Sequence, residues 1–95
     1  MMMDDNERRM LGLFVKGLNT RNPHPRDWER FYDFIVYAFS QGRRHGVGSL
    51  TLALEEQGLS YESAIQFARF YEYAIPLLGH YCDGEARKRG YPQAG

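Results

Sequence analysis

Apolar residues recur along this chain every three to four positions, the spacing of one face of an α-helix. The pattern covers residues 4–18, a stretch from Pro25 to Gly42, residues 49–57, and residues 60 to about 81. No stretch alternates apolar and polar residues clearly enough to predict a β-strand. We therefore predict an all-α fold, a compact bundle of about four helices.

Capping and stop residues fall at the ends that the apolar pattern predicts. Pro25 suits the first turn of a helix, because its missing backbone N–H would be unpaired there anyway. Ser49 and Ser60 are expected to be N-caps, since a serine hydroxyl accepts a hydrogen bond from a free amide of the first turn. Gly42 and Gly58 are expected to end helices, because glycine adopts the left-handed conformation that often follows the last turn.

The fourth predicted helix contains a proline, and the sequence beyond this helix changes character. Pro76 removes one backbone hydrogen bond and crowds the carbonyl of Glu72, so we expect a kink there. Residues 83–95 are polar and basic and contain glycine and proline, so we expect a flexible tail. The chain as a whole, residues 1–95, is expected to form a single helical domain.

Aromatic residues make up 15% of the chain, and the second and fourth predicted helices are rich in them. We expect this apolar surface to exceed what one small core covers, so that part of it contacts a protein partner or a second copy of the chain. The candidate interface residues are Trp28, Tyr32, Tyr37, Phe67, Phe70, Tyr71 and Tyr73. The other interpretation is that all of them belong to the core, with tyrosine hydroxyls at its rim.

The charge balance argues against a dedicated nucleic-acid-binding protein. Lys and Arg together number 12, as do Asp and Glu, so the formal net charge is zero. Phosphate neutralisation supplies most of the non-specific affinity of such proteins, which leaves only a local basic patch to bind DNA here. The stretch GRRHGVGSLT offers such a patch. Its candidate phosphate-binding residues are Arg43, Arg44, His45, Gly46 and Gly48.

The segment GVGSLT, residues 46–51, resembles the hairpin of helix-hairpin-helix DNA-binding motifs, in which a Gly-hydrophobic-Gly turn joins two helices. The resemblance implies that backbone amides of this turn face a DNA phosphate, which glycine and a helix N-terminus both favour. The segment departs from the family pattern at Leu52, where a small residue is usual, and at His45, where proline is usual. The alternative is a helix stop at Gly42, a basic loop, and a new helix capped by Ser49.

A helix-turn-helix is a second nucleic-acid interpretation of the stretch from Ser49 to Phe70. It would expose four residues at the start of a recognition helix: Ser60, Tyr61, Glu62 and Gln66. Against it, the carboxylate of Glu62 would face phosphate, and the helix carries little Arg or Lys.

Residues able to catalyse a reaction or bind a metal occur singly, and they form no recognisable catalytic or metal-binding motif. The possible soft ligands are His24, His45, His80 and Cys82. His80 and Cys82 are two positions apart and diverge by about 200° on a helix, and neither CxxC nor HExxH is present. We therefore expect no catalytic residue, no metal, no cofactor and no small-molecule substrate, and an enzyme is the least favoured class.

A cytoplasmic location is the simplest expectation. The single cysteine cannot form an internal disulfide, which indicates a reducing compartment. The N-terminal segment is polar and acidic before any apolar run, so no secretory signal is expected. The fourth predicted helix approaches membrane-spanning length, but Arg69 and Glu72 would then lie near the bilayer centre, so we expect no membrane association.

These observations favour a non-enzymatic helical protein–protein interaction module: a homodimer or other homo-oligomer, an adaptor, or an inhibitor of a larger protein machine. A short chain of this kind also suits an accessory protein of a phage or other mobile element. The alternative is a small nucleic-acid-binding protein that uses the basic loop at residues 42–49. Arg87, Lys88 and Arg89 are further candidate contacts for that alternative.

Overall fold

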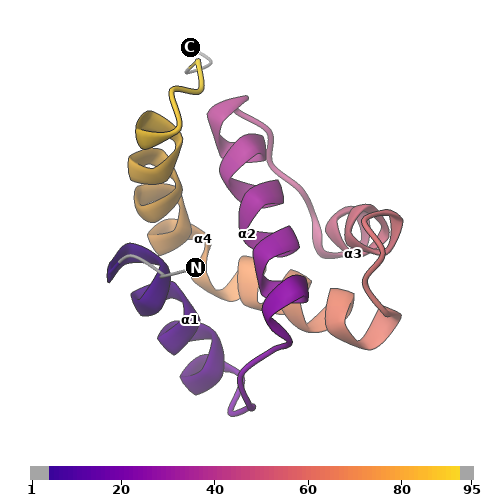
Figure 1. Ribbon diagram of the computed structural model, residues 1–95. Coiled ribbons are helices and arrows are strands. Elements are labelled where there is room, and N and C mark those ends of the chain that lie inside the picture. Colours follow the sequence, from indigo (N-terminus) through magenta and orange to yellow (C-terminus); the bar gives the residue numbers. More distant parts are fainter. Residues whose placement is uncertain (1–4, 93–95) are drawn as a thin grey trace.

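Four α-helices make up most of the part of the chain that the computed structural model describes, residues 5–92. They are α1 (Asp5–Gly17), α2 (Pro25–Ser40), α3 (Val47–Glu56) and α4 (Tyr61–Lys88) (Figure 1). No strand occurs among these described residues, and the radius of gyration is 12.4 Å. The predicted all-α bundle of four helices is confirmed.

The N-termini of α2 and α4 form at the signals that the sequence carries. Pro25 is the first residue of α2, and the imidazole Nδ1 of His24 accepts a hydrogen bond from the Arg26 amide at 3.1 Å. At α4 the hydroxyl of Ser60 accepts a hydrogen bond from the Ser63 amide at 3.2 Å. Both predicted starts are therefore confirmed, since each cap satisfies an amide that the first turn leaves unpaired.

Glycines follow the last turns of α2 and α3, as predicted. Gly42 has φ of 71° and Gly58 has φ of 99°, in the left-handed region that other residues rarely adopt. After Gly42, the amide of Arg43 donates back to the carbonyl of Ala38 at 2.9 Å, which pairs a carbonyl at the helix end. These two glycines turn the chain sharply enough for short connections between the helices.

The N-cap of α3 lies three residues before Ser49, the predicted cap. Its N-cap is Gly46, with extended backbone (φ −81°, ψ 170°) and no side-chain hydrogen bond, so Val47 and Gly48 belong to its first turn. The Ser49 hydroxyl is not the cap; it lies 3.1 Å from Nδ1 of His45. The prediction was wrong because the extended glycine already supplies the N-cap conformation, and its carbonyl accepts the first intrahelical hydrogen bond.

The helix α4 runs on to Lys88, into the segment predicted to be a flexible tail. That prediction is wrong for residues 83–88, and its last residues, 93–95, lie outside the described part of the chain. The helix extends this far because of tertiary packing. Cys82 and Ala86 are completely buried, so the C-terminal turns of α4 are packed on the rest of the bundle.

The course of α4 brings it against each of the other three helices. In Figure 1 its ribbon changes direction between the salmon N-terminal half and the yellow C-terminal half. Pro76 lies inside the helix between these halves. With this course, α4 is the central element of the bundle, and apolar residues on more than one of its faces are covered.

An aromatic cluster from α1, α2 and α4 occupies the core. Phe67 stacks on Phe31 with ring centroids 4.6 Å apart and on Phe14 at 5.0 Å. Trp28 lies 6.2 Å from Phe67, and Phe70 meets Phe14 edge-on at 5.3 Å. All five side chains are at most 2% exposed. Such ring pairs contribute about 0.5–1.5 kcal/mol each beyond the burial of their area, so the cluster fixes the three helices against one another.

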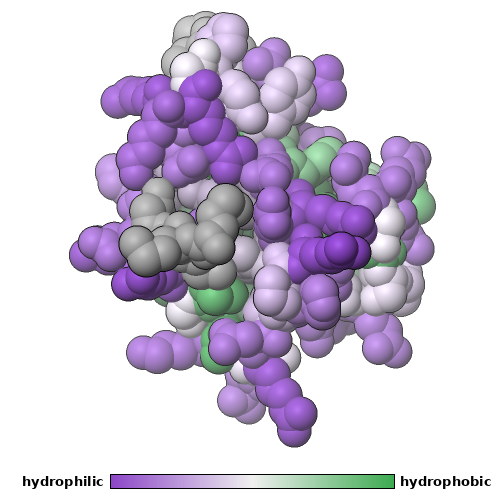
Figure 2. All heavy atoms as spheres, in the orientation of Figure 1, coloured by the Kyte–Doolittle hydropathy of each residue, from purple (hydrophilic) through white to green (hydrophobic). Residues whose placement is uncertain are grey.

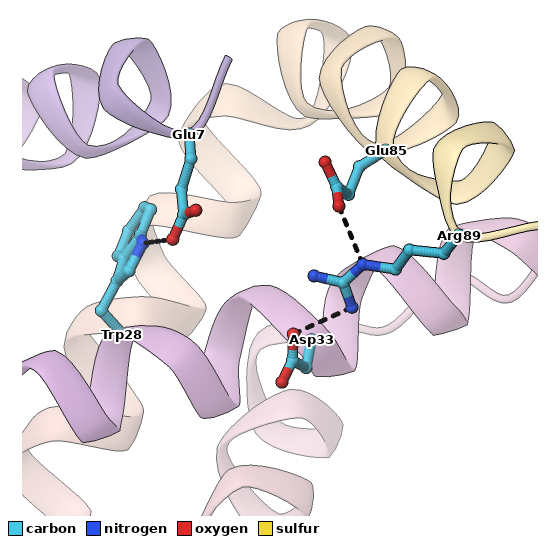
Figure 3. Close-up of polar contacts among 5 residues, drawn as sticks. All are labelled: Glu7, Trp28, Asp33, Glu85 and Arg89. Atoms are coloured by element: carbon cyan, nitrogen blue, oxygen red, sulfur yellow. Dashed lines mark hydrogen bonds and ion pairs between the residues drawn. The ribbon is translucent and has the colours of Figure 1, made fainter. Parts of the chain in front are cut away.

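Two polar contacts also join the helices (Figure 3). The indole Nε1 of Trp28 donates to the Glu7 carboxylate at 2.9 Å and links α2 to α1. Just past α4, Arg89 binds Asp33 of α2 and Glu85 of α4, each at 2.9 Å. Burial alone would lower the pKa of Arg89, but its hydrogen bonds to these carboxylates raise it above its ordinary value, so the guanidinium stays charged. This ion pair anchors the end of α4 on α2.

Candidate protein-binding surface

Five of the seven aromatic residues predicted to meet a partner lie in the core of the chain itself. Each of the five is at most 3% exposed: Trp28, Tyr32, Phe67, Phe70 and Tyr71. The interpretation of these five as a partner surface is corrected, because α4 packs on three helices and covers more aromatic surface than a single apolar stripe would. Of the seven, Tyr37 and Tyr73 are exposed.

Tyr73 is the first member of an apolar stripe on α4. Leu77 and Tyr81 follow at intervals of four residues, so the three side chains share one face of the helix. Tyr73 is 65% exposed and Leu77 is 50% exposed, whereas Tyr81 packs partly against the core. The stripe lies beside α1, because the Tyr73 ring is 2.9 Å from the point where a Cβ of Gly17 would stand. A side chain at Gly17 would therefore displace the ring.

An open groove of about 350 Å³ lies between α1 and α4, next to this stripe. Its lining residues are Arg9, Gly12, Leu13, Lys16 and Tyr81. Gly12 is exposed, and no atom lies within 4 Å of where its Cβ would stand, so the missing side chain leaves the groove open. Leu13 and Tyr81 give it an apolar floor, while Arg9 and Lys16 are exposed. We call this groove, together with Tyr73 and Leu77, the α1–α4 groove.

The remaining large apolar side chains with substantial exposure lie apart from this groove. Tyr37 meets the ring of Tyr91 edge-on at 5.9 Å, so it is partly engaged within the chain. Leu52 lies on α3, and Tyr61 is the first residue of α4. Figure 2 shows a mainly hydrophilic face with small, separate hydrophobic areas. Among the described residues, Tyr73 and Leu77 are the exposed large apolar pair one helical turn apart.

The candidate phosphate-binding residues lie in the loop between α2 and α3 and at the start of α3. They are Arg43, Arg44, His45, Gly46 and Gly48. The two arginines are exposed, although the Arg44 guanidinium lies over the Phe39 ring at 4.5 Å from its centroid. His45 is partly buried, and its amide donates to the Tyr71 hydroxyl at 3.4 Å. The loop therefore presents two exposed cations and turns its histidine toward the core.

The three further basic candidates near the C-terminus behave differently from one another. Arg89 is held between Asp33 and Glu85. Arg87 and Lys88 are exposed in the last turn of α4, where cations favour the negative end of the helix dipole.

A second open cleft, of about 520 Å³, lies where the α2–α3 loop meets α4. Its lining residues are Phe39, Arg44, Ile75, Pro76, Gly79, His80 and Asp83. Arg44 and Asp83 bring opposite charges to the same cleft, so its electrostatics favour neither an anion nor a cation.

Reactive groups are sparse in the part of the chain that the structure describes. No cluster of three or more His, Cys, Asp or Glu side chains there could hold a metal ion. Cys82 is completely buried, and burial raises the pKa of its thiol to about 12, so the thiol is protonated at neutral pH. No helix between residues 5 and 92 is long and apolar enough to cross a membrane.

Comparison with known proteins assigns no family to this fold. The chain matches no protein-family model, no curated protein and no solved structure. Function is therefore inferred from the surfaces of the molecule.

Proposed function

We propose that the protein is a non-enzymatic interaction module that binds another protein through the α1–α4 groove. The observation that carries this proposal is the exposed pair Tyr73 and Leu77, one helical turn apart beside an open groove. Single exposed apolar residues are ordinary on a protein surface, but adjacent ones next to a concave site are typical of a contact region. The other exposed large apolar residues that the structure describes, Tyr37, Leu52 and Tyr61, lie singly and apart from the groove.

The groove has the features that a binding partner would use. Leu77 lies midway along the stripe and would be fully removed from water by a partner, which favours binding by about 25 cal/mol per Å² of apolar area. Tyr73 adds an aromatic ring, one of the side chains that dominate binding energy at interfaces. Leu13 and Tyr81 are held by the core and give the site a preformed floor.

Site-specific photo-crosslinking tests the proposal. We expect a benzophenone amino acid in place of Leu77 to form a covalent adduct with a protein in cells that naturally make this chain. The matched control places the same amino acid at Leu52, which is 65% exposed but lies on α3, away from the groove. The adduct yield at position 77 should exceed that at position 52 several-fold.

The mass of the adduct identifies the kind of interaction. An adduct of twice the chain's own mass indicates a homo-oligomer, and any other discrete mass indicates a separate partner. Equal yields at positions 52 and 77, or no adduct at position 77, would contradict the proposal.

A second candidate function is binding of duplex DNA through the α2–α3 loop. Its supporting observations are two exposed arginines, Arg43 and Arg44, next to the N-terminus of α3, whose amides have no side-chain cap. Amides at a helix N-terminus and flexible cations are both suited to phosphate oxygens.

Salt dependence and charge reversal test this second candidate. If the two arginines each contact a phosphate, affinity for duplex DNA should fall about tenfold between 50 mM and 200 mM salt. The double substitution Arg43→Glu with Arg44→Glu should abolish binding in a fluorescence anisotropy titration. The matched control is Arg26→Glu with Arg30→Glu on α2, which changes the net charge equally. Equal loss in both double variants, or no binding by the unmodified protein at 50 mM salt, excludes a specific role for the loop.

A further inference from the structure

We infer that the α1–α4 groove accepts a short amphipathic helix whose apolar stripe is flanked by carboxylates. This inference rests on the proposed function and names the chemical class of the partner. It follows from the shape of the groove, from the signs of the charges that line it, and from the symmetry of a dimer that would use the same face.

The shape fits a helix. The floor of the site is formed by two helices that lie side by side, and such a groove seats the apolar stripe of a third helix. From Tyr73 to Tyr81 the stripe on α4 is about 12 Å long at 1.5 Å per residue. That length matches two to three turns of a partner helix with apolar residues at i, i+4 and i+7.

The charges that line the groove are both positive. Arg9 and Lys16 lie seven residues apart on α1, two turns and about 10 Å along the groove. No carboxylate is among the lining residues that the structure describes. A partner helix with Asp or Glu two turns apart on the flank facing α1 would pair with both cations, which gives specificity and orientation.

A second copy of the chain fits the groove less well. A two-fold symmetric dimer packs the same surface of one copy against that of the other. Arg9 and Lys16 of both copies would then approach one another across a small apolar contact. Like charges placed together oppose association, so the occupant is a different, acidic chain.

Two synthetic helical peptides test this inference. Both carry leucines at i, i+4 and i+7, and they differ only in flanking residues, which are glutamates in one and lysines in the other. We expect the glutamate peptide to bind the full-length protein about tenfold more tightly than the lysine peptide at low salt. In heteronuclear NMR spectra the glutamate peptide should shift backbone resonances around Leu13 and Leu77. The tenfold preference should shrink at high salt, since exposed charge pairs are screened.

Charge reversal on the protein separates the charge effect from the apolar contact. Arg9→Glu with Lys16→Glu should reverse the preference toward the lysine peptide, whereas Arg43→Glu with Arg44→Glu should leave it unchanged. Leu77→Asp should weaken both peptides, and Leu52→Asp should weaken neither. The inference is overturned if the two peptides bind equally, if neither binds, or if the shifted resonances lie elsewhere. Crosslinking from position 77 would still support the proposed function in those cases, so the two can fail separately.

Discussion

Replacing Phe67 with alanine is expected to lower the free energy of unfolding by about 3–5 kcal/mol. Phe67 is completely buried and stacks on Phe31 of α2 and Phe14 of α1, with Trp28 close by. Its removal deletes contacts with three rings at once and leaves a cavity that rigid aromatic neighbours fill poorly. Since small domains are stable by about 5–15 kcal/mol, this single change would remove a large fraction of the total.

Urea unfolding followed by circular dichroism measures this loss. The matched control is Tyr61→Ala, which deletes an aromatic ring from an exposed position on the same helix and should change stability by less than about 0.5 kcal/mol. The intermediate variant Phe67→Leu keeps part of the volume and should lose less than the alanine variant. A loss below about 1 kcal/mol for Phe67→Ala would contradict the central place of this ring in the core.

Local signals in the sequence predict most of the architecture. The apolar period predicts four helices, and Pro25, Ser60, Gly42 and Gly58 mark ends that the structure confirms. Each of these signals acts through the conformation or hydrogen bonding of its own turn. These helix ends can therefore be predicted from the sequence alone.

Structural features that depend on tertiary contacts could not be predicted from local sequence signals. The segment after Cys82 looks like a polar tail, yet it is helical to Lys88 because Ala86 is buried and Arg89 is bound by Asp33. Asp33 lies on α2 and Arg89 lies just past the end of α4, so nothing in the local sequence pairs them. The start of α3 was misplaced for a related reason, since either Gly46 or Ser49 can cap a helix and the folded chain uses the glycine.

The candidate binding surface also depends on tertiary contacts that the local sequence does not reveal. The sequence predicts that aromatics are abundant, but not which of them the bent α4 covers, and five of seven predicted interface residues proved to be buried. The spacing of Tyr73, Leu77 and Tyr81 is readable in advance. Whether this stripe can bind a partner depends on the neighbouring helix α1. There, Gly12 leaves the adjacent space open, and Gly17 allows the Tyr73 ring to approach. Only the packed structure shows that this stripe borders a groove with basic residues.

Alkaline conditions are expected to destabilise the folded protein through Cys82. Burial raises the pKa of this thiol from its ordinary value of 9.0 to about 12, with Asp83 contributing in the same direction. Above pH 9 the unfolded chain loses the thiol proton while the folded chain keeps it, so stability falls as pH rises. Each pH unit in this window corresponds to about 1.4 kcal/mol, which gives a loss of about 2 kcal/mol by pH 10.5.

The variant Cys82→Ala isolates this effect, because tyrosines and lysines titrate in both proteins and cancel in the comparison. At pH 8 the unmodified protein should be the more stable of the two by about 1 kcal/mol, since alanine leaves a small gap in the core. At pH 10.5 the order should reverse, because only the unmodified protein loses the thiol contribution. Urea unfolding of both proteins at the two pH values measures the change. An equal loss in the two proteins would mean that Cys82 titrates alike in the folded and unfolded chains, which would contradict its complete burial in the folded chain.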